Sequence, residues 1–124
     1  MFEIYVKDSF SAAHQLKECK GKCERIHGHN WNVEVAISSS ILSGGGMVVD
    51  FKHVQKKLSK VLQTLDHKLL NKCNFFKNSN PTAENVAYYI YRKLKSLLKV
   101  KNGVKIREVV VSEMNNARAK YIGD

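Results

Sequence analysis

The strongest constraint on the fold is an alternation of apolar and polar residues along two segments, 2–14 and 27–37. Side chains on a β-strand point to opposite faces in turn, so this pattern predicts two half-buried strands. The first segment has one apolar face that ends at a histidine and comprises Phe2, Ile4, Val6, Phe10, Ala12 and His14. The second has an apolar face that starts with two histidines and comprises His27, His29, Trp31, Val33, Val35 and Ile37. Both groups of histidines are therefore expected on the same, buried side.

Two later segments have the periodicity of amphipathic helices. Asp50 is a suitable N-cap for the first, whose apolar stripe comprises Phe51, Val54, Leu58, Val61, Leu62 and Leu65. The second is capped by Asn80 or Thr82, has Pro81 in its first turn and ends before Asn102. Its buried face comprises Val86, Ala87, Ile90, Leu94, Leu97 and Leu98.

The last segment, residues 104–124, reads as a strand, a turn at Asn115 and Asn116, and a closing strand. The order strand, strand, helix, helix, strand, strand predicts an α+β fold, with a four-stranded antiparallel sheet and two consecutive helices on one face. A chain of 124 residues is long enough for one core, so residues 1–124 are expected to form a single domain.

The spacing of the histidines predicts a metal site. His27 and His29 are two residues apart, so on a strand both imidazoles project from one face, about 6.5 to 7 Å apart at the backbone. If the strand that ends at His14 pairs with the strand that starts at His27, a third imidazole reaches the same point. Three neutral imidazoles favour zinc and leave a fourth position for substrate or water. The alternative is that the histidines serve separately as core or surface groups.

A structural zinc site is a second alternative, because a C-x3-C-x3-H-x-H pattern is formed by Cys19, Cys23, His27 and His29. Small zinc modules usually separate their two ligand pairs by about a dozen residues. Only three residues separate the pairs here, so the spacing favours the three-histidine site.

Other residues are candidates for proton transfer or recognition. Cys23 has basic neighbours that favour its thiolate, which would then abstract a proton from a group held on the metal. Asp66 and His67 are adjacent and can polarise a proton-transfer partner, although helix capping is the simpler role. Glu113 closes the apolar run VVVSE, where a carboxylate can accept two parallel hydrogen bonds from an amidine-like ring edge. A solvent-facing strand end is the alternative for Glu113.

Composition limits the partners. The formal net charge of +10 suits an anionic partner, either a phosphorylated metabolite or a nucleic acid. A nucleic-acid-binding module is disfavoured because interleaved aromatics and a basic recognition helix are missing. No run approaches the roughly 20 apolar residues of a membrane span, and the odd set of Cys19, Cys23 and Cys73 argues against disulfides. We expect a cytoplasmic protein with no membrane partner.

Six motifs in order resemble the 6-pyruvoyltetrahydropterin synthase superfamily. They are FSAAH (10–14), CERIHGHNW (23–31), VVDF (48–51), LDHKLLN (65–71), NPTAEN (80–85) and SE (112–113). The chain looks most like the 6-carboxytetrahydropterin synthase branch, which serves queuosine biosynthesis, because the pyruvoyl-forming enzymes tend to have a longer interval between the cysteine and the histidines. Met114, where relatives often have threonine, and Glu24 beside the thiol depart from the family pattern.

The resemblance implies a tunnelling fold that assembles into a barrel homo-oligomer, usually a trimer stacked into a hexamer, with active sites shared between subunits. It implies that His14, His27 and His29 bind zinc and that Cys23 is the proton acceptor. It further implies an Asp66 and His67 proton relay. Glu113 would anchor the pterin ring and join the relay, and Thr82 would lie near that ring.

The reaction implied is that of a zinc-dependent lyase acting on 7,8-dihydroneopterin triphosphate. The products would be 6-carboxy-5,6,7,8-tetrahydropterin, acetaldehyde and triphosphate. The alternatives within the superfamily are a 6-pyruvoyltetrahydropterin synthase and an aldolase that cleaves the pterin side chain.

Overall fold

The computed structural model describes residues 1–17, 24–101 and 103–124. The long strands are β1 (Phe2–His14), β2 (His27–Ser39), β4 (Val104–Met114) and β5 (Ala117–Ile122). The helices are α1 (Phe51–Gln63) and α2 (Ala83–Leu98), and a two-residue strand, β3 (Lys68–Leu69), precedes the 3-10 turns Leu70–Lys72 and Asn74–Phe76. The predicted order of two strands, two helices and a closing hairpin is therefore confirmed.

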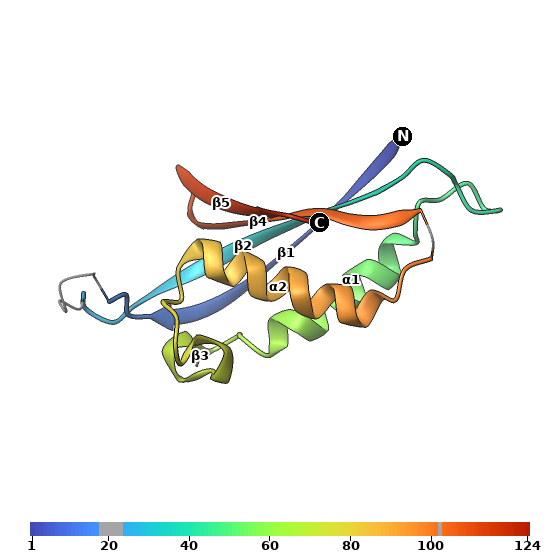
Figure 1. Cartoon of the computed structure of the whole chain (residues 1–124). Coiled ribbons are helices and arrows are strands. Elements are labelled where there is room, and N and C mark those ends of the chain that lie inside the picture. Colours follow the sequence, from blue (N-terminus) through green and yellow to red (C-terminus); the bar gives the residue numbers. More distant parts are fainter. Residues whose placement is uncertain (18–23, 102) are drawn as a thin grey trace.

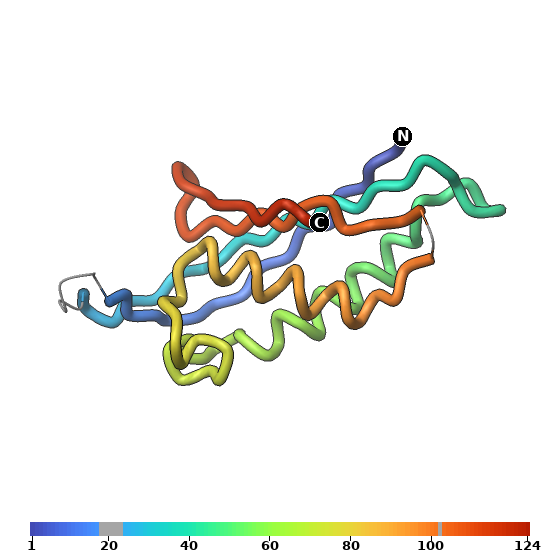
Figure 2. The backbone as a smooth tube through the Cα atoms, in the orientation of Figure 1, coloured from blue at the N-terminus to red at the C-terminus, as the bar shows by residue number. Residues whose placement is uncertain are grey.

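The sheet has the order β3-β1-β2-β4-β5, and both helices lie on one of its faces (Figure 1). The long strands pair antiparallel, as expected. The sheet has one strand more than predicted, because the chain after α1 returns along the end of β1 and pairs with it in parallel at Ala12 and Ala13. Figure 2 shows α2 running along the sheet with α1 beside it.

The first turns of the two helices differ from expectation in two respects. Asp50 caps α1 by accepting the N–H of Lys52, but Phe51 is 54% exposed because the buried face of α1 begins only at Val54. Thr82 caps α2, so Pro81 precedes the cap and does not lie in the first turn. The carbonyl of Pro81 has another partner, described below.

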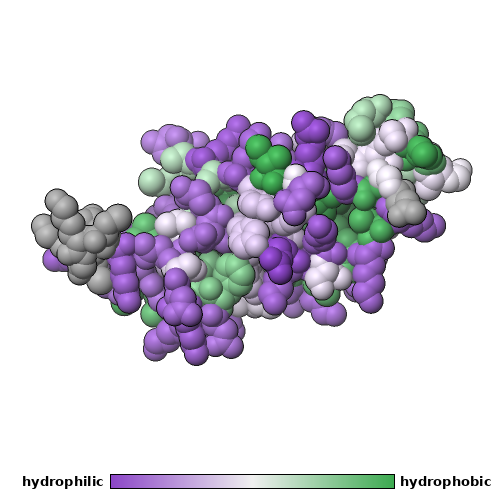
Figure 3. Space-filling view, viewed as in Figure 1, coloured by the Kyte–Doolittle hydropathy of each residue, from purple (hydrophilic) through white to green (hydrophobic). Residues whose placement is uncertain are grey.

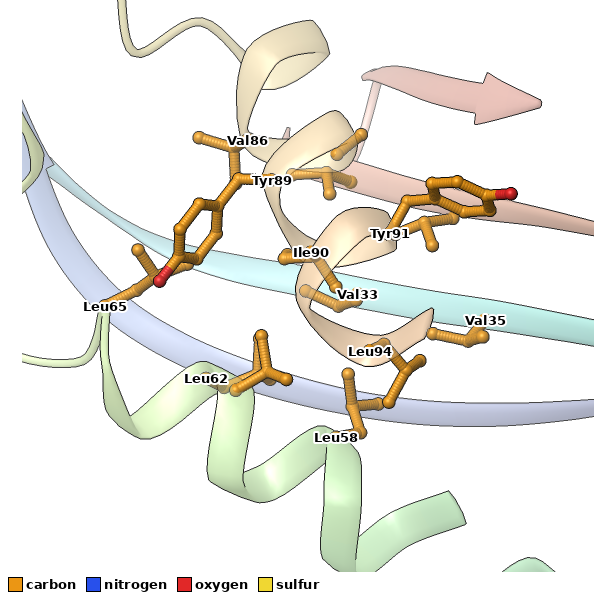
Figure 4. Packing of buried hydrophobic residues seen from close by; sticks show 14 of the residues in the cluster. Val33, Val35, Leu58, Leu62, Leu65, Val86, Tyr89, Ile90, Tyr91 and Leu94 are labelled. Carbon is orange, nitrogen blue, oxygen red and sulfur yellow. The ribbon is translucent and has the colours of Figure 1, made fainter. Parts of the chain in front are cut away.

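One apolar core lies between the sheet and the helices. Figure 4 shows Leu58 and Leu62 of α1 facing Ile90 and Leu94 of α2, with Val33 of the sheet behind them. On the view in Figure 3 the outer surface is mostly hydrophilic, and hydrophobic side chains gather near the β2–α1 connection. The exposed apolar residues of that region are Ile41, Leu42, Met47 and Phe51. No helix among the described residues is long and apolar enough to span a membrane.

Candidate metal centre

The pairing of β1 with β2 brings the three histidines together. His14 lies opposite His27, and Ala12 lies opposite His29, at the end of the sheet where β1 finishes and β2 starts (Figure 1). A ligand nitrogen from each of the three rings lies within 4.8 Å of the other two. His14 is completely buried, and His27 and His29 are partly buried. The side chains that alternation assigns to the buried face thus meet at one point.

Main-chain carbonyls orient two of the rings. Nδ1 of His14 lies 2.7 Å from the carbonyl oxygen of Pro81, and Nδ1 of His27 lies 2.8 Å from that of Arg25. Because a carbonyl oxygen only accepts, each Nδ1 carries a proton, which leaves Nε2 of each ring as the nitrogen available to a metal ion. The two Nε2 atoms lie 3.0 Å apart. Two lone pairs facing each other at this distance would repel, so a proton or a metal ion between the two nitrogens would stabilise this arrangement.

His29 completes the cluster with an unsatisfied nitrogen. Its Nε2 atom is buried and has no hydrogen-bond partner among the described residues. Burial is the main cause that lowers the pKa of His29; Glu113 opposes this effect, and His14 and His27 reinforce it. A lowered pKa keeps the ring neutral, which is the form that binds a metal.

The cluster fits a divalent metal ion. Metal–nitrogen bonds of about 2.0 to 2.1 Å at tetrahedral angles place two ligand nitrogens about 3.3 to 3.4 Å apart. The observed 3.0 Å between the Nε2 atoms of His14 and His27 is a few tenths of an ångström shorter, so small ring movements suffice. Trp31 backs the site, with its ring centroid 4.9 Å from that of His14 and 5.5 Å from that of His29. This completely buried indole keeps water away from one side of the cluster.

Two asparagines hold the chain beyond His14. Asn71 accepts the N–H of Gln15 at 2.8 Å and donates to its carbonyl at 2.7 Å. Asn80 accepts the N–H of Lys17 at 2.8 Å and also donates to the carbonyl of Lys17. Each side-chain amide therefore binds one residue as a neighbouring strand would. The sequence analysis missed both roles, although each asparagine lies in a motif that carries the family resemblance.

Asp66 and His67 form a pair on the surface. Oδ2 of Asp66 lies 2.9 Å from Nδ1 of His67, and Oδ1 accepts the N–H of Ser11 at 2.9 Å. His67 has a left-handed backbone (φ 58°), is bonded through its N–H to the carbonyl of Ser11, and has a side chain that is 83% exposed. In the described part of the chain, neither side chain forms a hydrogen bond or ion pair with the histidine cluster.

Glu113 lies beside the cluster. Its Oε1 atom is 3.8 Å from Nε2 of His14, and its Oε2 atom is 3.6 Å from Nε2 of His29. Because Val109 and Val111 share its parity on β4 and are fully buried, the strand directs Glu113 to the helix side. The same parity argument was open to sequence analysis.

Thr82 and the two residues that depart from the family pattern, Glu24 and Met114, lie at varied positions. Thr82 accepts the N–H of Asn85 at 3.2 Å as the cap of α2, directly after Pro81. Glu24 has a carboxylate oxygen 3.7 Å from Nδ1 of His27, and Met114 is 53% exposed. Cys23, the predicted proton acceptor, lies outside the described residues, as does Cys19.

Together these features define an α+β protein with three converging imidazoles at one end of an antiparallel sheet. Similarity to known proteins gives a more specific assignment. The chain belongs to the 6-pyruvoyl tetrahydropterin synthase family, whose match spans residues 3–124.

Relatives in this family have several names. A 6-carboxy-5,6,7,8-tetrahydropterin synthase from Synechocystis sp. is 39% identical over 99 residues, which cover 76% of this chain and 75% of that protein. A dihydroneopterin monophosphate aldolase from Pyrococcus furiosus is 34% identical, with 90% of each chain covered. The solved structure of Caenorhabditis elegans 6-pyruvoyl tetrahydropterin synthase superposes with a TM-score of 0.87 at 34% identity, covering 99% of this chain and 96% of that one.

The environment of Asp66 predicts an acid dependence of stability. The N–H of Ser11 is the first cause, and His67 the second, that lower the pKa of Asp66 below its usual 3.8. A carboxyl with a lowered folded-state pKa stabilises the protein above its unfolded-state pKa, and this contribution is lost as the pH falls through the folded-state pKa. We therefore expect Asp66→Asn to lose less free energy of unfolding than the parent when the pH falls below about 3.8.

Urea unfolding at a series of pH values, with protein concentration held constant, measures this difference. Asp8→Asn is the control, since Asp8 also accepts a main-chain N–H, that of Ser9, but lies on β1 without an imidazole partner. Equal acid dependence in the parent and in Asp66→Asn would contradict the assignment.

Proposed function

We propose that the chain is a zinc-dependent 6-carboxytetrahydropterin synthase, folded as one domain over residues 1–124. It would convert 7,8-dihydroneopterin triphosphate to 6-carboxy-5,6,7,8-tetrahydropterin and release acetaldehyde and triphosphate. The observation that carries the proposal is the convergence of three imidazoles, one of which has a buried nitrogen with no hydrogen-bond partner in the described part of the chain. Family membership and the 6-carboxytetrahydropterin synthase relatives support the choice of a pterin substrate.

Zinc is the metal that the ligand set supports best. A site of three histidines with a free fourth position is characteristic of catalytic zinc. Zinc bound by His14, His27 and His29 would act as a Lewis acid on the oxygens of the substrate side chain and stabilise negative charge there. The carbonyls of Pro81 and Arg25 support this role because they hold two of the rings in the required tautomer.

Cys23 is proposed as the group that accepts a proton from the substrate side chain. Its position in the sequence supports this role, since it lies four residues before His27. The next residue, Glu24, donates its main-chain N–H to the carbonyl of Leu16 at 3.1 Å and has its carboxylate close to His27. The chain on the C-terminal side of Cys23 is thus tied to the metal centre.

Glu113 and several lysines are proposed to hold the substrate, with Thr82 near the pterin ring. A carboxylate can accept two N–H groups from the amidine edge of a pterin, and Glu113 presents one beside the cluster. A hollow of about 550 Å³ is lined by His29, His67 and Lys68 among others. Lys68 also lines a second hollow of about 790 Å³, together with Lys72 and Lys93. These positive charges suit the triphosphate of the proposed substrate.

We further propose that the active form is a homo-oligomer in which Asp66 and His67 act as a proton relay in the site of a neighbouring subunit. The 83% exposure of the His67 side chain supports this arrangement. The sheet also ends in two edges that suit pairing with other copies. One is β5, and the other is β1, which β3 covers only at Ala12 and Ala13.

The products formed from 7,8-dihydroneopterin triphosphate test the proposed reaction. The zinc-loaded protein is expected to yield acetaldehyde, triphosphate and a pterin with the mass of 6-carboxy-5,6,7,8-tetrahydropterin, because the three-histidine centre and the carboxy-forming relatives point to this lyase. Mass spectrometry of the mixture identifies the products, and the chelator-treated protein is the control. Triphosphate without acetaldehyde would instead establish the 6-pyruvoyl reaction, which the C. elegans structure favours. Cleavage without release of triphosphate would support the aldolase reaction, which the P. furiosus relative favours.

The proposed role of Cys23 is tested by Cys23→Ala. Loss of a general base typically lowers the turnover number by about 10² to 10⁴-fold, and zinc content is expected to stay that of the parent because the histidines remain. Cys73→Ala is the control, since burial raises the pKa of this half-buried thiol and keeps it protonated at neutral pH. Turnover and zinc content are measured on the same preparations. Loss of zinc from Cys23→Ala would contradict the proposal and favour a cysteine-ligated structural site.

A further inference from the structure

Glu113 occupies a position that its proposed role as a pterin anchor does not require. Its two carboxylate oxygens lie 3.8 Å from Nε2 of His14 and 3.6 Å from Nε2 of His29. These are the nitrogens that the three-histidine site directs inward. Among the described residues, a ligand atom from each of the three histidines lies within 4.8 Å of the other two, and Glu113 does not belong to this group. The carboxylate therefore borders the cluster on the side of His14 and His29.

The backbone around Glu113 allows its side chain to be redirected. The pairing of β2 with β4 ends at Asn32 and Ser112, one residue before Glu113. On the other side of β4, Ser112 pairs with Arg118 and Met114 pairs with Ala117, so the register shifts at Glu113. Such β-bulges occur next to active sites, where they re-aim a side chain. Glu113 therefore has no paired residue on β2 or β5 at the point where its side chain approaches the histidines.

The chemistry of the cluster favours a carboxylate as a fourth ligand. A metal ion on three neutral imidazoles keeps its full positive charge in a site that Trp31 partly closes to water. Ligand bonds of about 2.0 to 2.2 Å at tetrahedral angles require a nitrogen-to-oxygen distance of about 3.3 to 3.5 Å. The observed distances of 3.6 and 3.8 Å exceed this by a few tenths of an ångström. Glu113 is not among the groups that all lie within 4.8 Å of one another, so its side chain must also rotate toward His27 to complete the coordination.

We propose that Glu113 is the fourth ligand of the metal ion in the absence of substrate and leaves the ion when a pterin ring binds. The inference rests on the proposed function, because the amidine edge of the ring is the group that competes for the carboxylate. One carboxylate cannot make both sets of contacts, so anchoring the ring opens the fourth position of the metal. A ligand without two adjacent N–H donors would leave the site closed. Glu113 then couples recognition of the ring to exposure of the reactive metal position.

Metal release in the absence of substrate tests the ligand role. Removing a ligand speeds metal loss, so zinc transfer from Glu113→Gln to a chromophoric chelator is expected to be at least about tenfold faster than from the parent. Glu108→Gln is a matched control, because Glu108 lies on the same strand and its side chain has the same 22% exposure, but it pairs with Lys120. Glu108→Gln is expected to release zinc at the parent rate. Equal rates for all three proteins would overturn the proposal.

The exchange is tested by adding a ligand to the parent protein, and Glu113→Gln serves only as the spectral reference. With cobalt(II) in place of zinc, adding unsubstituted pterin, which has the ring but no side-chain hydroxyls to bind the metal, is expected to change the visible d–d spectrum. The change should approach the spectrum of cobalt-loaded Glu113→Gln without added pterin. The fluorescence of Trp31, the only tryptophan and a direct neighbour of two of the histidines, reports whether each protein keeps a native site.

These measurements separate the inference from the proposed reaction. If pterin is shown to bind by its own fluorescence and the cobalt spectrum stays unchanged, the exchange is excluded. If the spectrum changes as expected but dihydroneopterin triphosphate is not turned over, the carboxylate exchange stands and the proposed reaction fails.

Discussion

The metal centre depends on the antiparallel register between β1 and β2. Because side chains alternate between the faces of a strand, a shift of one residue in either strand would turn its histidines away from the helices. The observed pairing sets His14 opposite His27 and places the small Ala12 opposite His29, which leaves space for the rings. Trp31 strengthens the same register, since its indole N–H donates to the carbonyl of Ala12 at 3.1 Å. One buried side chain thus links the core to the site.

Segments distant in sequence hold this end of β1 in place. The carbonyl of Pro81 orients His14, while the amides of Asn71 and Asn80 bind the main chain of Gln15 and Lys17. Each of these interactions links residues more than 50 positions apart, at 67, 56 and 63 residues. The motif around Pro81 therefore serves both the metal centre, through the Pro81 carbonyl, and the architecture, through the amide of Asn80. Nδ1 of the ligand His14 and the helix cap Thr82 are connected through Pro81 alone.

Sequence periodicity predicted the elements that rely on a regular pattern, because burial of one face dictates alternation in a strand and a stripe in a helix. It predicted the two strand faces that carry the histidines, both helices and the closing hairpin. It did not predict β3, the asparagine contacts or the use of the Pro81 carbonyl, since these depend on how distant segments meet and not on a local repeat. Phe51 matched the helical stripe but lies outside the buried face, because the helix extends beyond the core at that end. Strand parity could have placed Glu113 on the helix side, but the register shift beside it depends on how β4 pairs with β5 and is not visible in the sequence.

The central claim is that three imidazoles, and no thiolate, bind one divalent ion at the end of the sheet. X-ray absorption at the zinc edge tests it most directly, because nitrogen or oxygen ligands lie at about 2.0 to 2.2 Å and sulfur at about 2.3 Å. For the zinc-loaded protein the account predicts a first shell of nitrogen and oxygen only, with the outer-shell scattering of three imidazole rings. A sulfur ligand in that shell, or scattering from fewer than three rings, would contradict it.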